Sequence, residues 1–195
     1  TYSVAENQTA ITTVAGSDVD EDALTIALSG TDAASFNLST SNVLTFAEAP
    51  DFETRTSYAI TLSVSDESET TSKDITILIT NVNDIAPVIS SAATFSAAEN
   101  QTAIGSVVAT DAEDDPLTYA VSGTELAISS TGVLTFVAAP DYETKSSYTA
   151  TVTVNDGTNS TTQAITVSVT NINDIAPVIS SSATFSAAEN QTAIG

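Results

Sequence analysis

The chain of 195 residues carries 25 acidic and three basic side chains, which gives a formal net charge of −22 at neutral pH. Such a charge repels phosphate backbones and anionic lipid surfaces, so we expect no nucleic acid partner and no direct membrane contact. A hydrophobic content of 42% argues against disorder, and the lack of Cys and His argues against disulfides and against zinc or copper sites.

Alternation of apolar and polar residues predicts strands along the whole chain, because a half-buried strand repeats every two residues. In chain order the predicted strands cover residues 11–14, 24–28, 43–46, 58–64, 75–79, 148–154 and 165–169, with further short strands in the second half of the chain. About seven short strands in each half predict an all-β fold of two tandem antiparallel Greek-key sandwiches of the immunoglobulin-like type.

A repeat of 90 residues sets the domain organisation. Residues 81–87, NVNDIAP, return as NINDIAP at 171–177. We therefore predict one repeat in residues 1–84 with a truncated start and a second in residues 85–174. Residues 175–195 would hold a linker and the first-strand fragment of a third repeat, as in a longer array. The acidic segments that begin at Asp18 and Asp111 are 93 residues apart, which places three extra residues near 31–36 of the first repeat.

Several acids recur in both repeats, and each falls at a predicted strand end. Turn preference alone does not explain why Glu6, Asp51 and Glu53 return in the same order. Carboxylate, amide and carbonyl oxygens are the ligands that Ca²⁺ takes, about six to eight at a time. The recurring pairs are Glu6 with Glu99, Asp18 with Asp111, Asp51 with Asp141, Glu53 with Glu143, Asp66 with Asp156, and Asp84 with Asp174.

These motifs, in this order, resemble the cadherin repeat over the whole chain. In that family a Glu near the first strand, an Asp-x-Glu and an Asp-x-Asn-Asp-Asn-Ala-Pro linker come from one repeat, and an Asp-x-Asp and a later Asp come from the next. The resemblance implies about three Ca²⁺ ions at each junction. This chain departs from the pattern at Asn81 and Ile85 in the linker and at Glu113, which replaces the second Asp of Asp-x-Asp.

The resemblance also implies a ligand set. At the junction the first repeat would supply Glu6, Asp51, Glu53, Asn83 and Asp84, the Val82 and Ile85 carbonyls would coordinate, and the second repeat would supply Asp111, Glu113 and Asp156. Partial sites are expected at both ends, from Asp18, Asp20 and Asp66 at one end and from Glu99, Asp141, Glu143, Asn173 and Asp174 at the other.

The expected function is that of a calcium-rigidified extracellular module of a cell-surface adhesin, serving as a spacer or a homophilic contact. The composition, rich in Ser, Thr and Ala and poor in Lys, is similar to that of repetitive bacterial surface adhesins. Expected partners are calcium ions and the neighbouring repeats, with another copy of the chain or a surface glycan as further candidates. One way to bind a copy is for the tail at 184–195 to pair with a sheet edge.

The alternative is a carbohydrate-binding accessory module of a secreted polysaccharide-degrading protein, although the lack of Trp weakens it. We do not expect an enzyme. No His is present to serve as a base for a Ser or Thr nucleophile. Asp51 and Glu53 could be read as the acid pair of a glycosidase, but nothing in the sequence indicates the substrate cleft that such a pair requires.

Overall fold

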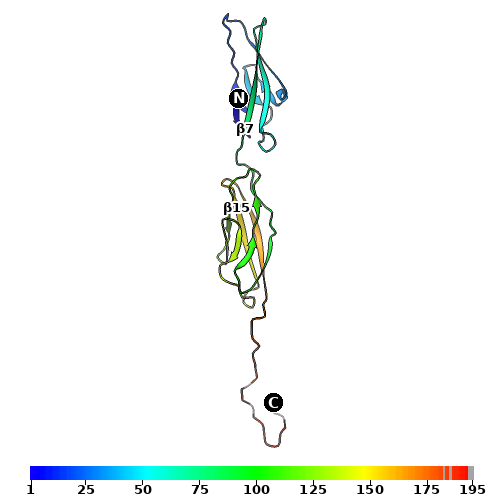
Figure 1. Cartoon of the computed structure of the whole chain (residues 1–195), viewed down its shortest axis with the longest axis vertical. Coiled ribbons are helices and arrows are strands. Elements are labelled where there is room, and N and C mark those ends of the chain that lie inside the picture. The colour runs from blue at the N-terminus through cyan, green and yellow to red at the C-terminus, as the bar shows by residue number, and fades with distance from the viewer. Residues whose placement is uncertain (182, 185, 193–195) are drawn as a thin grey trace.

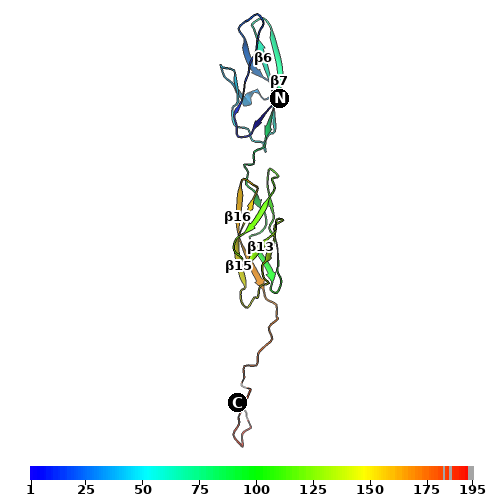
Figure 2. The same cartoon turned by 90° about the vertical axis from the view of Figure 1, so that its left-hand side faces the viewer.

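The computed structural model describes residues 1–181, 183–184 and 186–192. Two β-sandwiches lie end to end along one axis and are joined by the linker that follows β7 (Thr70–Thr80) (Figures 1 and 2). Beyond β16 (Ser160–Thr170) the chain continues as an extended tail, in which the described residues form no strand. Within the described part of the chain, no helix has the length and apolarity needed to cross a bilayer.

The first sandwich has a four-stranded sheet facing a three-stranded sheet. The larger sheet has the order β1-β7-β6-β3, and the smaller has the order β2-β5-β4. A short 3-10 helix, η1 (Ala33–Ser35), precedes β4, which lies at one edge of the smaller sheet. The strands, besides β7, are β1 (Tyr2–Ala5), β2 (Ala10–Thr13), β3 (Thr25–Ser29), β4 (Phe36–Leu38), β5 (Val43–Phe46) and β6 (Ser57–Ser65).

The second sandwich repeats this arrangement with the orders β12-β15-β16-β9 and β10-β14-β13. It adds a two-stranded sheet in which β8, from the segment that follows the linker, pairs with β11, which follows β10. Its strands, besides β16, are β8 (Val88–Ile89), β9 (Thr94–Ala98), β10 (Ala103–Ser106), β11 (Ala109–Thr110), β12 (Thr118–Val121), β13 (Leu126–Ile128), β14 (Val133–Phe136) and β15 (Ser147–Asn155).

The prediction of wholly antiparallel sheets is wrong for one pair in each sandwich. In the first sandwich β1 pairs in parallel with β7, with Tyr2 opposite Ile77 and Ala5 opposite Thr80, while the other pairs of that sandwich are antiparallel. β9 and β16 repeat this parallel pairing. Two parallel strands end at the same edge of the sheet, so the residues after β1 lie beside the linker that follows β7.

Each sandwich has its own core between its two sheets. On β7 the side chains of Ile75, Ile77 and Ile79 are buried, whereas their neighbours are exposed. This is the alternation of a strand with one face in the core and one in water. Leu44 and Leu134 are fully buried at matching places in the two cores. The two cores contain no residue in common, so packing joins strands within a sandwich and the linker joins the sandwiches.

Most of the predicted strands are confirmed. The strand predicted at 43–46 coincides with β5, and those at 58–64 and 75–79 lie inside β6 and β7. The predicted insertion is also located: residues 31–35, which include η1, separate Gly30 from β4 in the first sandwich, whereas only Thr124 and Glu125 separate Gly123 from β13 in the second. The predicted third-repeat fragment at 175–195 falls partly on residues 182, 185 and 193–195, which lie outside the described residues.

Replacing Leu44 with Ala should lower the stability of the first sandwich by about 2–5 kcal/mol, because it leaves a cavity in a fully packed core. The second sandwich should keep its own stability, since its core is separate. Hydrogen exchange resolved by domain measures both effects. The matched control is Val43→Ala at the neighbouring, partly exposed position. Equal losses in the two sandwiches would contradict separate cores.

Candidate metal centre

Glu6 lies buried where β1 ends, beside the linker. The parallel pairing of β1 with β7 continues through the bond from Glu6 N to the Thr80 carbonyl, at 3.1 Å. One Glu6 carboxylate oxygen accepts the N–H of Val82 and the other accepts the N–H of Phe52, each at 2.8 Å. With its side chain almost fully buried, Glu6 therefore connects the first strand, the segment after Pro50 and the linker.

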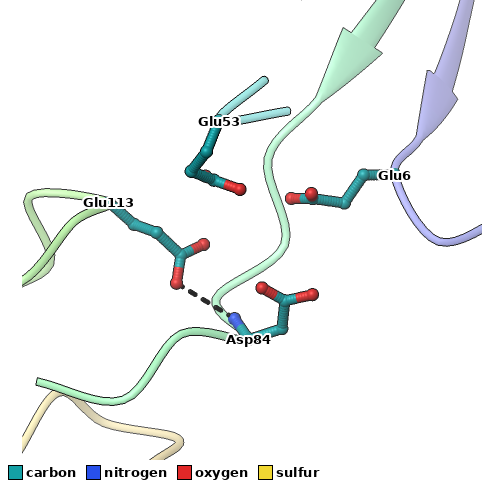
Figure 3. A group of neighbouring side chains, drawn as sticks. All are labelled: Glu6, Glu53, Asp84 and Glu113. Carbon is teal, nitrogen blue, oxygen red and sulfur yellow. Dashed lines mark hydrogen bonds between the residues drawn. The ribbon is translucent and has the colours of Figure 1, made fainter. Parts of the chain in front are cut away.

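Four carboxylates converge at this junction, and we call them the junction group. Glu6, Glu53 and Asp84 come from the first sandwich and its linker, and Glu113 comes from the second sandwich (Figure 3). One oxygen from each lies within 4.8 Å of the others. Like charges at this separation repel unless a cation or a proton lies among them.

Glu113 is the member that crosses the junction. One of its oxygens accepts the N–H of Asp84 at 3.1 Å (Figure 3). The same oxygen accepts the N–H of Ile85 at 2.8 Å. Glu113 also belongs to a second group with Asp111 and Asp115, in which Asp111 accepts the backbone N–H of the other two residues. The departure from Asp-x-Asp thus places a longer side chain where it reaches the linker backbone.

Asp156 approaches the linker from the turn between β15 and β16. Its backbone carbonyl accepts the side-chain N–H of Asn83 at 3.2 Å. One carboxylate oxygen accepts the N–H groups of Thr158 and Asn159, at 2.7 Å and 2.5 Å. Burial acts to raise the pKa of Asp156, but these donors outweigh it and hold the pKa below its ordinary value. Asp156 is therefore an ionised carboxylate enclosed by protein.

Three carboxylate oxygens at this junction are buried and have no hydrogen-bond partner among the described residues. They belong to Asp111, Glu113 and Asp156, all of which are residues of the predicted ligand set. Buried polar atoms almost always find a partner, because leaving one unpaired costs roughly 1–3 kcal/mol and more for a charged group. The three atoms therefore leave acceptor positions at the junction that a cation could fill.

Asp51 lies outside the junction group. Its two carboxylate oxygens accept the backbone N–H and the hydroxyl of Thr54, at 3.1 Å and 2.8 Å. These bonds lower its pKa and hold the turn that presents Glu53. Glu53 shows the opposite shift, since loss of solvent and the charges of Glu6, Glu113 and Asp51 raise its pKa.

The far ends of the two sandwiches carry the residues predicted for partial sites. At the end of the second sandwich, Glu99, Asp141 and Glu143 form a third group within 4.8 Å. Asp174 there accepts a bond from Asn100 at 2.6 Å, and Asn173 is exposed. At the opposite end, Asp18 and Asp66 line a hollow of about 320 Å³. Asp20 is held nearby through its N–H, which Asp18 accepts at 2.8 Å.

Three residues that contribute to the junction were not predicted from the sequence. Asn7, in a left-handed turn at φ 62°, donates to Asp84, and its presence in the repeated Ala-Glu-Asn motif was the available signal. Asp115 continues the spacing of Asp111 and Glu113. Asn159 donates to Asn83 but has no counterpart in the first repeat, where Glu69 stands at its position, so the repeat pattern could not reveal it.

The structure is similar to solved structures of cadherins and protocadherins. It matches human Protocadherin-24 EC1-2 with a TM-score of 0.75 and 20% identity, over 87% of this chain and 93% of that one. For mouse Cadherin-23 EC22-24 the TM-score is 0.76 with 21% identity, over 89% of this chain and 64% of that one. For Drosophila N-cadherin EC1-4 it is 0.74 with 24% identity, over 87% and 47%.

The chain is a tandem pair of cadherin-like β-sandwich domains. By sequence, residues 83–170 match the family described as the bacterial Ig domain. A comparison with curated proteins gave no match. Domains of these kinds are usually extracellular or surface-exposed and typically non-catalytic. At these identities, the likeness to the cadherin structures concerns the fold alone.

Glu53→Gln should raise the melting temperature of the calcium-free chain at neutral pH, because it removes one charge from the junction group. A carboxylate whose folded pKa is raised destabilises the fold above that pKa and has no effect below its unfolded value. The gain should therefore shrink as the pH falls towards the ordinary value of 4.5. Thermal unfolding in chelator over a pH series measures it. Glu48→Gln, at an exposed site in the same sandwich, should show no comparable gain; a similar gain there would contradict the electrostatic explanation.

Proposed function

We propose that the junction binds Ca²⁺ and that the bound ions make the two domains one stiff unit. The observation that carries this proposal is the set of buried, unpartnered oxygens on Asp111, Glu113 and Asp156. They accompany four carboxylates within 4.8 Å of one another. A cation would satisfy the unpartnered oxygens and relieve the repulsion in the group at the same time.

The donor set fits a hard cation. All the candidate ligands are oxygens, and the chain contains no Cys or His to offer a soft ligand. Ca²⁺ accepts about six to eight oxygens in flexible geometry, whereas Mg²⁺ needs a near-ideal octahedron and keeps several waters. Protein oxygens are plentiful here, which favours Ca²⁺. The full set of Glu6, Asp51, Glu53, Val82, Asn83, Asp84, Ile85, Asp111, Glu113 and Asp156 would hold about three ions.

The mechanical effect follows from where the ligands originate. Glu6 and Glu53 belong to the first domain, Asp84 to the linker and Glu113 to the second domain (Figure 3). Ions shared among them cross-link the end of one domain to the start of the next. Because binding free energy adds to the stability of the form that binds, the ions would resist bending, unfolding and proteolysis of the linker.

Such a stiff module suits a spacer in an extracellular protein, where it would hold an adhesive region away from a surface. The group of Glu99, Asp141 and Glu143 would join the set when a further domain follows. Asp18, Asp20 and Asp66 would do the same for a preceding domain. Both end sites would bind Ca²⁺ weakly in this chain, since each holds ligands from only one side.

Carbohydrate binding is supported less well. Each domain has a recess of about 410–420 Å³, lined by Tyr58 and Asp51 in the first domain and by Tyr148 and Asp141 in the second. A sugar would stack on the ring faces, yet Arg55 and Lys145 already lie over those rings, at 4.2 Å and 4.4 Å from the centroids. Because a cation already covers each ring, both tyrosines are better explained as structural residues than as a sugar-binding surface.

Small-angle scattering should show a longer and stiffer particle with Ca²⁺ than with chelator. The physical reason is that shared ions remove the repulsion that opposes alignment of the two domains. The same comparison with Mg²⁺ serves as the control for a general effect of divalent charge. Identical profiles with Ca²⁺ and with chelator would refute calcium stiffening.

Asp84→Asn should weaken Ca²⁺ binding by about tenfold or more, because it removes a charged ligand from the linker while keeping its shape. Titration calorimetry measures the change. Glu48→Gln removes the same charge from an exposed position outside the junction group and should leave the affinity nearly unchanged. If both variants bind equally well, the assignment of Asp84 fails.

A further inference from the structure

Besides the bonds to the Glu113 carboxylate, the linker is held to the second domain by contacts of Asn83 that involve no charged side chain. The side chain of Asn83 is bonded at both of its polar atoms. Its nitrogen donates to the Asp156 carbonyl at 3.2 Å, and its oxygen accepts from the side-chain nitrogen of Asn159 at 2.9 Å. The same nitrogen of Asn159 lies 3.5 Å from the Asn83 carbonyl. We call this pair of asparagines the amide clasp.

Hydrogen bonds within its own turn fix the position of Asn159, independently of its contact with the linker. It ends the turn between β15 and β16, where its N–H binds Asp156 at 2.5 Å. Its carbonyl accepts from the side chain of Asn155 at 2.8 Å. Asn159 therefore presents its amide from a turn that is fixed at both sides, which limits the entropy lost when it binds Asn83.

The first domain builds the same turn with a different side chain at this position. Asp66 accepts the N–H groups of Ser68 and Glu69, as Asp156 does for Thr158 and Asn159. The Glu69 carboxylate could not donate to an amide oxygen, because an ionised carboxylate only accepts. The turn does not need asparagine for its own fold, so Asn159 is distinguished by its bond to the linker.

The amide clasp differs from the other junction contacts in that both of its side chains are neutral. Glu113 binds the backbone N–H groups of the linker while close to Glu6, Glu53 and Asp84, whose repulsion opposes that contact when no cation is present. The clasp joins two neutral amides, so this repulsion does not act on it directly. It is the contact expected to persist when cations leave.

We propose that Asn159 is a positioning residue that holds the linker on the second domain without metal. By fixing Asn83, it keeps Asp84 and Ile85 next to Glu113, so the ligands from the linker and the second domain stay together. Bending in the calcium-free chain then takes place between the first domain and Asn83. Asn83 belongs to the proposed calcium ligand set but Asn159 does not, so substitutions of Asn159 in the absence of metal test this role separately from the calcium proposal.

The test uses distances between spin labels on the two domains in chelator. The natural chain has no Cys, so Thr76→Cys and Thr162→Cys, at exposed positions on β7 and β16, provide unique label sites. Asn159→Ala in this background should raise the population of bent orientations by about fivefold, the effect of losing a neutral hydrogen bond. Asn159→Asp keeps the shape but removes the donor, and it should behave like Asn159→Ala.

The matched control is Thr158→Ala, which changes an exposed side chain in the same turn and should leave the distances unchanged. A double-mutant cycle with Asn83→Ala adds a second check, because two partners of one bond should not have additive effects. The second domain should keep its melting temperature to within a few degrees in Asn159→Ala, which distinguishes positioning from a structural role in that domain.

Distances in Asn159→Ala that match those of Thr158→Ala would overturn the proposal, as would additive effects of Asn83→Ala and Asn159→Ala. Failure of the calcium proposal gives a different result, namely no change in the unmodified domain pair when Ca²⁺ is added. The comparison in chelator stays valid in that case, so the two proposals can fail independently.

Discussion

The parallel pairing of β1 with β7, which β9 repeats with β16, is the constraint on which the junction depends. Because β1 and β7 end at the same edge of the sheet, Glu6 lies beside the linker and its carboxylate accepts the Val82 N–H. Antiparallel pairing would place Glu6 at the far end of the domain. β9 and β16 repeat the pairing, so Glu99 lies beside the second linker and accepts the Ile172 N–H. A local feature of the sheet thus creates an acidic site at the end of every repeat.

Two kinds of interaction then meet at the junction, and they respond differently to cations. The carboxylates of the junction group repel one another, and three buried oxygens nearby lack partners. The bond between Asn83 and Asn159 is neutral and is made within the protein. Cation binding should therefore control how the first domain is aligned, while the amide clasp controls which domain the linker follows.

The repeat itself shows which parts of the sequence serve the fold and which serve the junction. Tyr58 and Tyr148 both pack beside a core phenylalanine, and Leu44 and Leu134 fill the same place in the two cores. The turns after β6 and β15 keep the same aspartate-centred hydrogen bonds. Position 159 differs, with Asn in place of Glu69, although the turn around it is unchanged. Because the hydrogen bonds of the turn are the same in both domains, the change from Glu69 to Asn159 alters the contact with the linker and leaves the fold of the domain as it is.

The sequence by itself determined the strands and most of the acids that converge. Period-two alternation identifies a strand such as β7 because one face is buried, and the repeat identifies Glu6, Glu53 and Asp84 because they return in order. Only the tertiary structure decided which of these carboxylates face one another, that Asp51 accepts the bonds of the turn at Thr54, and that Asn159 binds the linker. Periodicity reports which side of a strand is buried but contains no information on which strand lies beside it. Contacts between residues 76 positions apart, such as Asn83 and Asn159, depend on that neighbour relation.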